Sequence, residues 1–312
     1  MGGDIIKILM LGNTQSGKTT YMSSAYSFLQ KPVYGFSVKS KDKHVHKWFL
    51  RLYDNIRSEN IYPSPTDKKS SYEFNLYYHG TPILPFEWKD FKGGIIDTSG
   101  NDINDLVDDI KKSDAIMMFF EGDALLKNER SRTRLRRVCN LINHNLSDID
   151  DLFFITIVIT KYDLLLNEHE FNQVISPLNA FIKAAEENEN IIVHVVPVAC
   201  TKHEFLHVDL PLLTILYGGI LKNYINKGSE IKKLLKQAEE YSTKAGWLDN
   251  MLSKIFGEVT YQELAQKTID NAQNEYEIFK KIEGAAEQLG KFIDEYEHFK
   301  AKPLYEYDIF ML

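Results

Sequence analysis

The sequence is poor in cysteine and has no apolar run long enough to cross a bilayer. Its 312 residues include two cysteines, Cys139 and Cys200, each within an apolar or helical stretch. So few cysteines argue against a disulfide framework and favour a reducing compartment. The longest apolar runs, AIMMFF and LFFITIVI, are far too short for a membrane span and are typical of buried strands. The chain enters its first apolar strand within five residues, which leaves no room for a signal peptide, so we expect a cytoplasmic protein.

An excess of positive charge is also missing. The formal net charge of −7 gives no electrostatic reason to expect nucleic acid as a partner. The length allows one large α/β domain and a smaller second unit. Arginine is scarce and uneven, because five of the seven arginines lie between Arg130 and Arg137 and none follows. This cluster fits either a solvated helix face or a surface that docks carboxylates, and the sequence leaves its role open.

Strand-like apolar runs alternate with helical patterns over the first two thirds of the chain. This alternation predicts an α/β fold in which a mainly parallel sheet carries helices on both faces. The predicted strands cover residues 5–11, 72–78, 94–97, 115–121, 152–160 and 191–198. The predicted helices cover residues 18–29, 45–57, 129–146 and 169–187. Residues 71–100 alternate in polarity and contain turn signals, so we predict an antiparallel hairpin at the edge of the sheet.

The alternation stops near Leu210, and the remaining sequence is helical in pattern. Apolar residues recur at spacings of three and four on both sides of FGEVTYQE, a segment that contains a helix-ending Gly257 and a capping box from Thr260 to Glu263. We therefore predict an α/β domain over residues 1–227 and an all-α antiparallel helical hairpin, a coiled-coil unit, over residues 228–312. The hairpin is a candidate surface for a protein partner or for self-association. A membrane-binding face is not favoured, because GWLDNMLSKIFG continues the apolar stripe of the hairpin.

The stretch MLGNTQSGKTT follows the first predicted strand. It fits the pattern G-x-x-x-x-G-K-[ST], with Gly12, Gly17, Lys18 and Thr19 at the fixed positions. Such a loop turns several backbone N–H groups toward phosphate, its lysine reaches the β- and γ-phosphates, and its hydroxyl binds Mg²⁺. The residues expected to contact nucleotide here are Gly12, Asn13, Thr14, Gln15, Ser16, Gly17, Lys18, Thr19 and Thr20.

The tetrapeptide TKYD at residues 160–163 bears on the choice between GTP and ATP. It follows the apolar strand LFFITIVI, so Asp163 lies near a strand end, where a carboxylate can accept two hydrogen bonds from the N1–H and N2–H₂ edge of guanine. Adenine has no such donor pair, and the stem of Lys161 can lie across the base. Upstream, IIDTSGND places Asp97 at the end of a predicted strand, where it can hold a water of the Mg²⁺ shell. Gly100 then lets a backbone N–H approach the γ-phosphate.

In this order and spacing, the motifs over residues 5–227 resemble those of the Ras-like, translation-factor-related P-loop GTPases. The resemblance implies binding of GTP and GDP with Mg²⁺, and hydrolysis of GTP. The fourth motif of that superfamily usually begins with asparagine, which Thr160 replaces. The fifth motif presents its backbone to the guanine oxygen and corresponds to Ala199, Cys200 and Thr201, a looser match. The region ahead of the predicted hairpin is similar to the bacterial double-GTPase group within the superfamily.

The same resemblance implies a threonine in the first switch that senses Mg²⁺ and the γ-phosphate. We assign it to Thr66, with Ser70 and Ser71 as competing positions. The expected metal-binding residues are Thr19, Thr66 and Asp97. The expected catalytic residues are Lys18, Thr66 and Asn101.

The catalytic pattern departs from the Ras-like one. Asn101 stands where many members carry a water-orienting glutamine, and its side chain is one methylene shorter. We therefore expect slow intrinsic hydrolysis that depends on a partner or a second protomer. Arg57, ahead of the first switch, is either an arginine that acts on the γ-phosphate in cis or a solvated charge at a helix end.

These inferences predict a GTP-binding and Mg²⁺-dependent GTP-hydrolysing switch with the helical hairpin as output or assembly element. One alternative is a pseudo-GTPase that binds nucleotide and barely turns it over, which Asn101 favours. A second is a P-loop ATPase or kinase, which TKYD disfavours. A third is a dynamin-like, membrane-associated GTPase, which the hairpin suggests. The sequence identifies neither the partner nor the oligomeric state.

Overall fold

The computed structural model describes residues 5–64, 69–91, 101–146, 149, 151–165, 168–188, 190–244 and 261–295. The chain divides into two compact units. The first comprises Met1–Gly219 with Leu289–Leu312, and the second comprises Ile220–Gln288. No helix in the described ranges is both long enough and apolar enough to cross a membrane.

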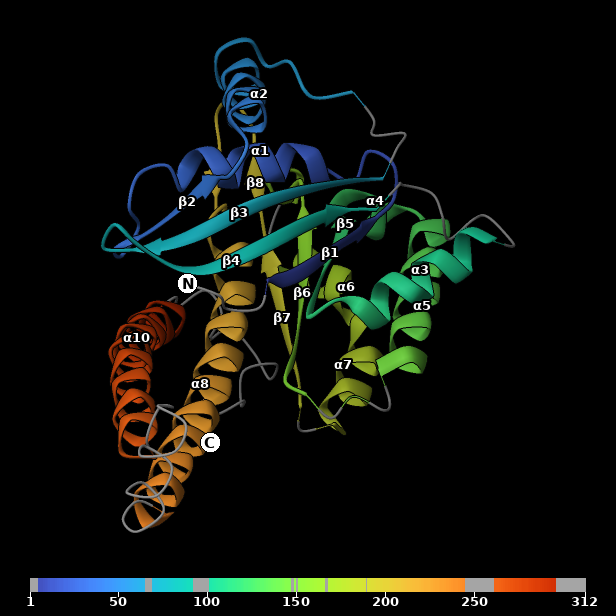
Figure 1. Cartoon of the computed structure of the whole chain (residues 1–312). Helices are drawn as coiled ribbons and strands as arrows, with labels where there is room; N and C mark the ends of the chain where they lie inside the picture. Colours follow the sequence, from blue (N-terminus) through green and yellow to red (C-terminus); the bar gives the residue numbers. More distant parts are fainter. Residues whose placement is uncertain are drawn as a thin grey trace. The chain divides into compact units, whose positions relative to one another are not determined.

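The first unit is built on a seven-stranded sheet with the order β2-β3-β4-β1-β5-β6-β7 (Figure 1). Its central strand β1 lies parallel to β4 and β5, while β2, β3 and β4 are antiparallel neighbours. The strands are β1 (Ile6–Gly12), β2 (Phe36–Ser40), β3 (Ser70–Tyr78), β4 (Thr81–Asp90), β5 (Ala115–Glu121), β6 (Phe153–Thr160) and β7 (Ile191–Pro197). This arrangement confirms the predicted α/β fold class, with a mainly parallel sheet that has an antiparallel edge.

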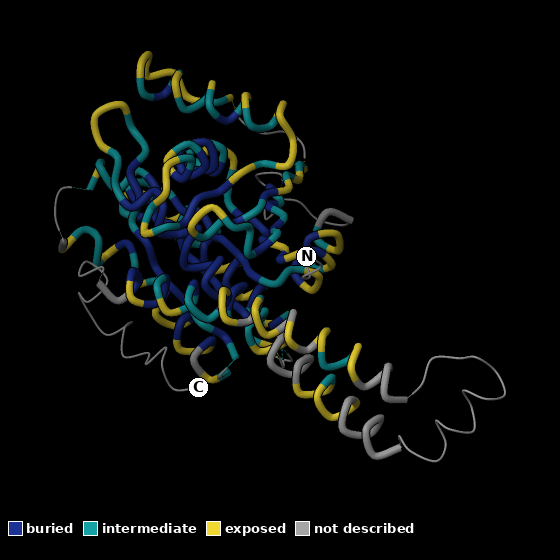
Figure 2. Tube along the Cα trace, turned by 60° about the vertical axis from the view of Figure 1, so that its left-hand side comes forward, coloured by how far each residue is buried: buried dark blue, intermediate teal, exposed yellow. Residues whose placement is uncertain are grey.

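Helices cover both faces of this sheet. The α-helices of the described residues are α1 (Lys18–Phe28), α2 (Lys43–Asp54), α3 (Asn101–Lys112), α4 (Gly122–Lys127), α5 (Glu129–Leu146), α6 (Glu168–Ile175), α7 (Asn179–Glu186), α8 (Leu210–Lys244) and α10 (Tyr261–Glu295). Of these, α8 from Ile220 and α10 up to Gln288 belong to the second unit and are not part of the cover of the sheet. Helices α3, α5, α6 and α7 share a core with one set of alternating strand residues, such as Ile116 and Ile155. The opposite face packs against α1, where Tyr21 contacts Phe119, and against the start of α8. All eight residues of β6 are buried, as expected for a parallel strand covered on both sides. Figure 2 shows the buried residues gathered in the interior of the first unit.

Several elements differ from the predictions. The strand β2 and the helices α3 and α4 were not predicted, and the second strand of the edge hairpin is β4. The predicted helix over residues 45–57 ends as an α-helix at Asp54 and continues as the π-helical turn η1 (Asn55–Glu59). The predicted helix over 169–187 is interrupted by the 3₁₀ turn η4 (Ser176–Leu178), because Pro177 has no N–H and disfavours a helical residue before it. The strand predicted over 94–97 lies outside the described residues.

The second unit contains the later part of α8 and the first part of α10. The two helices lie side by side and run in opposite directions (Figures 1 and 2). The Tyr224 hydroxyl donates a hydrogen bond to Oε1 of Glu283 at 3.3 Å between them. An antiparallel helical hairpin is therefore present, while a domain boundary at residue 227 and a coiled coil stay predictions. The turn predicted around Gly257 and Thr260 lies outside the described residues.

Candidate functional site

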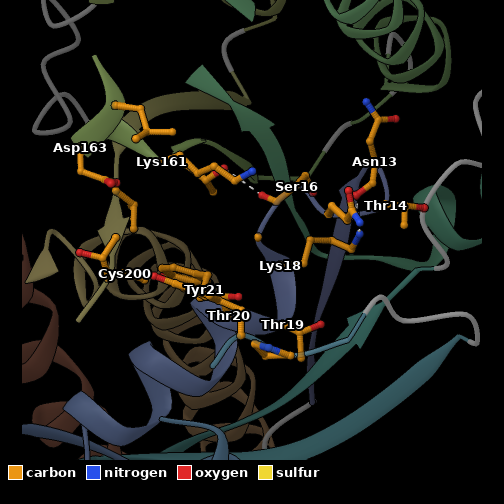
Figure 3. Close-up of a pocket in the computed structure, with 18 of the residues that line it drawn as sticks. Asn13, Thr14, Ser16, Lys18, Thr19, Thr20, Tyr21, Lys161, Asp163 and Cys200 are labelled. Carbon is orange, nitrogen blue, oxygen red and sulfur yellow. Dashed lines mark hydrogen bonds between the residues drawn. The ribbon is translucent and has the colours of Figure 1, made fainter. Parts of the chain in front are cut away.

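A cavity of about 510 Å³ opens beside the start of α1 (Figure 3). Three regions far apart in the sequence form its walls: the β1–α1 loop, the segment after η1, and the ends of β6 and β7. The lining residues are Asn13, Thr14, Gln15, Ser16, Gly17, Lys18, Thr19, Thr20, Tyr21, Tyr62, Pro63, Ser64, Thr160, Lys161, Asp163, Leu164, Val198, Cys200 and Thr201. The structure thus brings the predicted P-loop, TKYD and part of the predicted fifth motif around one space.

The β1–α1 loop has the backbone of a phosphate-binding loop. Gly17 precedes α1 with φ 86°, a left-handed conformation in which a side chain would be strained. The Ser16 N–H donates to the main-chain oxygen of Asn13 at 3.1 Å, which closes the loop in front of the helix. The first N–H groups of α1 have no helical acceptor, and they carry the positive end of the helix dipole. An anion would find a cluster of backbone donors here.

Lys18 lies inside this loop rather than in solvent. It is 6% exposed, and its Nζ donates to the main-chain oxygen of Gly12 at 3.0 Å, with that of Asn13 at 3.4 Å. The Oδ1 atom of Asp90 is 3.9 Å from Nζ. Burial lowers the pKa of Lys18, and the charge of Asp90 opposes that shift. The ammonium group is therefore partly desolvated, and an anion that replaced these neutral carbonyls would bind it strongly.

Asp90 is the carboxylate that the structure places beside the P-loop. It ends β4, is 2% exposed and pairs in register with Met10 of β1. Burial raises the pKa of Asp90 to about 6, and Lys18 opposes this shift. Its Oδ1 has no hydrogen-bond partner among the described residues. Burial without a hydrogen bond is costly for a carboxylate, so the position suits a cationic ligand or its hydration shell.

Asp90 was not among the predicted site residues, although the sequence contains a signal for it. Asp90 begins the tetrapeptide DFKG, a second D-x-x-G seven residues before the predicted Asp97. Asp97 and Gly100 lie outside the described residues, so their predicted roles stay predictions. The pairing of β4 with β1 places Asp90 next to the end of β1.

The TKYD segment lies at the other end of the cavity. The Thr160 hydroxyl donates to the main-chain oxygen of Ser16 at 2.9 Å and so ties β6 to the P-loop. Lys161 has a left-handed backbone, with φ 56°, and its ammonium group pairs with Glu121 at 2.8 Å. Asp163 lies in the 3₁₀ turn η3 (Tyr162–Leu164), and its buried Oδ1 has no hydrogen-bond partner among the described residues. A ligand with hydrogen-bond donors on one edge would satisfy this carboxylate.

The predicted fifth motif forms the short strand β8 (Ala199–Cys200), which pairs with β9 (Phe205–Leu206). Cys200 and Thr201 line the cavity, while Ala199 is buried and is not part of the lining. Burial raises the pKa of the Cys200 thiol to about 12, so the group stays protonated near neutral pH.

The predicted switch and catalytic residues are less well defined. Thr66 lies outside the described residues, and so does the side chain of Asn101, the first residue of α3. The competing Ser70 and Ser71 are in β3, where the Ser71 hydroxyl donates to Glu87. Arg57 donates from Nη1 to the main-chain oxygen of Thr201 at 2.9 Å. Arg57 is therefore neither a solvated helix-end charge nor, in this structure, directed at the P-loop.

The arginine cluster has a partly structural role. Arg132 donates from Nε to the main-chain oxygen of Leu125 at 2.8 Å and also bonds that of Leu126, which satisfies the last turn of α4. Arg132 and Arg136 each pair with Glu129 at 3.1 Å. These intramolecular contacts explain the positions of Arg132 and Arg136, two of the five clustered arginines, with no need for a partner molecule.

Two aromatic residues of the lining, Tyr62 and Tyr21, were not among the predicted site residues. Tyr62 follows a left-handed Asn60 after η1, and burial followed by the charge of Asp163 raises the pKa of its hydroxyl. Tyr21 contributes a buried hydroxyl without a hydrogen-bond partner among the described residues. Both aromatic residues reach the cavity through tertiary contacts that a local pattern does not encode.

No protein-family model matches the chain, and no curated protein matches it. Among solved structures, the chain is similar to the bacterial selenocysteine-specific elongation factor EF-Sec, with 14% identity and a TM-score of 0.39 over 69% of this chain and 29% of that one. It is similar to the elongation factor SelB from Methanococcus maripaludis, solved with the GTP analogue GppNHp, with 14% identity and a TM-score of 0.41 over 69% and 34%.

A third similar structure is the signal recognition particle receptor SRb-GTP/SRX complex from Chaetomium thermophilum. Here the identity is 12% and the TM-score is 0.39, over 64% of this chain and 92% of that one. The chain spans about a third of the length of the two elongation factors. Similarity at this level supports no conclusion about what this chain binds.

Proposed function

We propose that the protein binds guanine nucleotide with Mg²⁺ and hydrolyses GTP as a molecular switch. The observation that carries the proposal is one cavity of about 510 Å³ with the P-loop at one end and Asp163 at the other (Figure 3). The volume is within the range of small-molecule and cofactor sites. One end offers N–H donors and a lysine to phosphate, and the other end offers a carboxylate to a base.

At the phosphate end, the backbone of residues 13–18 and the ammonium group of Lys18 would hold the β- and γ-phosphates. Lys18 would exchange its contacts with Gly12 and Asn13 for phosphate oxygens, at little cost because those contacts are to neutral carbonyls. The desolvation of Lys18 strengthens its attraction to an anion.

Residues that fit Mg²⁺ lie beside Lys18. Thr19 is in the cavity lining, and the buried Oδ1 of Asp90 has no hydrogen-bond partner among the described residues. Oxygen ligands of this kind match the preference of Mg²⁺ for carboxylate, hydroxyl and water. Thr19 would bind the ion directly and Asp90 through water, with Thr66 and Asp97 as the further predicted ligands. The bound ion would neutralise negative charge that develops on the transferred phosphoryl group.

At the base end, Asp163 would accept hydrogen bonds from N1–H and N2–H₂ of guanine, and Lys161 would cover the base. The ammonium group of Lys161 is already paired with the carboxylate of Glu121. This ion pair fixes the direction in which the Lys161 side chain extends. The backbone at Cys200 and Thr201 would face the guanine oxygen. Adenine presents an acceptor where guanine presents N1–H, so it would leave Asp163 unsatisfied.

Hydrolysis would depend mainly on positioning and on charge neutralisation, which is general for phosphoryl transfer. Lys18 would neutralise the phosphates, and the backbone at Gly100 would approach the γ-phosphate. Asn101 would orient water less effectively than a glutamine, so the proposed intrinsic rate is low. The helical hairpin would serve as the output or assembly element, through a protein partner or self-association.

Nucleotide identification on the purified full chain tests the binding proposal. We expect GDP or GTP to co-purify, identified by mass and base absorbance, and titrations to give much tighter binding of GDP than of ADP. Asp163→Asn should weaken GDP binding and favour xanthosine diphosphate, whose base accepts where guanine donates. Asp54→Asn, an exposed carboxylate at the end of α2, is the matched control. Equal affinities for GDP and ADP would contradict the assignment of Asp163.

Phosphate release from GTP tests the catalytic proposal separately. The wild type should release phosphate slowly in the presence of Mg²⁺, and Lys18→Ala should abolish the release. Negligible single-turnover hydrolysis by a protein that binds GTP tightly would instead support the pseudo-GTPase alternative. Light scattering in GDP and in a non-hydrolysable GTP analogue would show whether nucleotide state changes self-association.

A further inference from the structure

Two side chains, Arg57 and Lys202, join η1 to the turn between β8 and β9 through three hydrogen bonds. The Arg57 guanidinium donates from Nη1 to the main-chain oxygens of Thr201 at 2.9 Å and Lys202 at 3.0 Å. In the opposite direction, the ammonium group of Lys202 donates to the main-chain oxygen of Ser58 at 2.9 Å. Each segment thus supplies one charged donor and main-chain acceptors to the other. We call these contacts the Arg57–Lys202 clamp.

The aromatic ring of Phe205 packs against the Arg57 side chain of the clamp. The Arg57 guanidinium carbon lies 5.0 Å from the centroid of the Phe205 ring. That ring in turn packs against Tyr53 of α2 at 5.7 Å and Phe28 of α1 at 5.9 Å. A planar guanidinium can lie over the ring while it donates hydrogen bonds within its own plane, a geometry that a tetrahedral ammonium group matches less well. The geometry therefore favours arginine at position 57.

Both clamped segments continue directly into the wall of the cavity. After η1 the chain turns at Asn60, with φ 58°, and the Tyr62 hydroxyl donates to Oδ1 of Asn60 at 3.1 Å. Tyr62, Pro63 and Ser64 then line the cavity, as do Cys200 and Thr201 from the other segment. The clamp therefore holds together two parts of the cavity wall, residues 62–64 and residues 200–201, that are far apart in the sequence.

We propose that Arg57 and Lys202 are positioning residues that hold these two walls together and slow the release of bound guanine nucleotide. This inference rests on the proposed function, because the walls adjoin Asp163, the proposed base reader. Neither residue needs to touch the nucleotide. Arg57 holds the backbone of Thr201 in place for the base, and Lys202 holds the segment that leads to Tyr62.

The two contacts act on the same pair of segments, so their effects should be coupled. Loss of Arg57 removes two charge-assisted hydrogen bonds and the ring contact, while loss of Lys202 removes one bond from an exposed side chain. A variant that lacks both side chains should then be little worse than Arg57→Ala alone. Contacts that act independently would instead give effects that multiply.

Alkylation of Cys200 tests the clamp without nucleotide. Cys200 lines the cavity as a partly buried thiol, whereas Cys139 is a buried residue of α5 and serves as an internal reference. In nucleotide-free protein, Arg57→Ala and Lys202→Ala should each raise the rate at which iodoacetamide modifies Cys200, read by peptide mass spectrometry, and leave Cys139 unchanged. Arg51→Ala, an exposed arginine on α2, is the matched control and should match the wild type.

Nucleotide release gives the second measurement. With a ribose-labelled fluorescent GDP, we expect Arg57→Ala to raise the dissociation rate at least about tenfold and Lys202→Ala a few-fold, with the preference for GDP over ADP retained. Arg57→Lys should stay closer to Arg57→Ala than to the wild type. Circular dichroism and thermal melting of the exposed-site variant Lys202→Ala check that any change is not loss of folding.

The outcomes separate this inference from the proposed function. Wild-type Cys200 alkylation and wild-type GDP release in both Arg57→Ala and the double variant would overturn the clamp. A wild-type protein that fails to bind GDP would overturn the proposed function, and faster Cys200 alkylation in the same variants would still show that the clamp closes the cavity. A lost preference for GDP over ADP would also contradict a role limited to positioning.

Discussion

The Thr160 hydroxyl lies 2.9 Å from the main-chain oxygen of Ser16, so the end of β6 is hydrogen-bonded to the P-loop. The same hydroxyl lies 3.2 Å from the main-chain oxygen of Phe120 in β5. A Cβ atom on Gly17 would meet the Thr160 methyl group at 3.4 Å. Thr160 therefore links the proposed phosphate end of the site to the segment that carries Asp163.

Replacement of Thr160 by valine should weaken nucleotide binding. Valine keeps the shape and removes the donor, so the buried oxygen of Ser16 loses its partner at a cost of about 1–3 kcal/mol. A share of about 0.5–1.5 kcal/mol that weakens the bound state relative to the free state should raise the dissociation constant for GDP about two- to tenfold. Isothermal titration measures this, and Thr160→Ser, which keeps the hydroxyl, should stay near the wild type. Unchanged binding by Thr160→Val would show that the hydrogen bond does not order the loop.

The two D-x-x-G patterns make different predictions for Mg²⁺. Because Asp90 lies 3.9 Å from the Lys18 ammonium group, we expect Asp90→Asn to raise the Mg²⁺ concentration required for GTP binding and hydrolysis by about tenfold or more. Asp97→Asn is the matched comparison, and it should have the smaller effect. The measurement is phosphate release as a function of free Mg²⁺. A larger effect of Asp97→Asn would contradict the role proposed for Asp90 and support the one predicted for Asp97.

Local patterns in the sequence were sufficient for the P-loop, for TKYD and for the buried strands. The predicted strand over 115–121 and the predicted helix over 129–146 have the bounds of β5 and α5. These segments are long, periodic and flanked by clear breaks, so local propensity and tertiary packing agree. The place of the β1–α1 loop beside the cavity was predictable for a related reason, because its residues come from one continuous stretch of chain. Its binding of phosphate stays a prediction.

Non-local pairing explains what the sequence did not reveal. The strand β4 contains Pro82 and Pro85 and looks like a turn-rich segment, yet it pairs along its length with β3 and β1. Only that pairing places Asp90 beside the end of β1, while the predicted role of Asp97 stays a prediction. The contact from Arg57 to Thr201 spans 144 residues and has no local signature. Tyr62 enters the site for the same reason, since η1 is fixed against a distant turn.

Gly218 lies where α8 approaches the sheet most closely. A Cβ atom at this position would be 2.1 Å from Cδ2 of Phe154, so the buried ring or the helix would have to move. Overpacking of this kind costs about 1–3 kcal/mol, more than the gain of up to about 1 kcal/mol that alanine offers in a helix. Gly218→Ala should therefore lower the free energy of unfolding in urea. Gly284→Ala in α10, where a Cβ atom meets nothing within 4 Å, should be neutral or stabilising.

His194 on β7 should make the fold sensitive to acid. The side chain is 5% exposed and stacks on Phe154 with ring centroids 6.3 Å apart. Burial lowers the pKa of His194 from 6.5 to about 4. Between these values the unfolded chain binds a proton that the folded chain does not, so stability falls as the pH drops from 6.5 to 4. The loss attributable to this group is at most about 3 kcal/mol, at 1.36 kcal/mol per pKa unit.

Replacement of His194 by leucine separates this term from the rest of the acid response. Leucine has a similar volume and cannot take up a proton, so the free energy of unfolding should fall less steeply with acid in His194→Leu than in the wild type. Urea titrations at pH 7.0, roughly 5.5 and roughly 4.5 measure the two slopes. His44→Leu, at an exposed position on α2, is the control and should keep the wild-type slope. Parallel slopes for wild type and His194→Leu would mean that His194 gains its proton in the folded state as readily as in the unfolded chain, which burial against Phe154 should prevent.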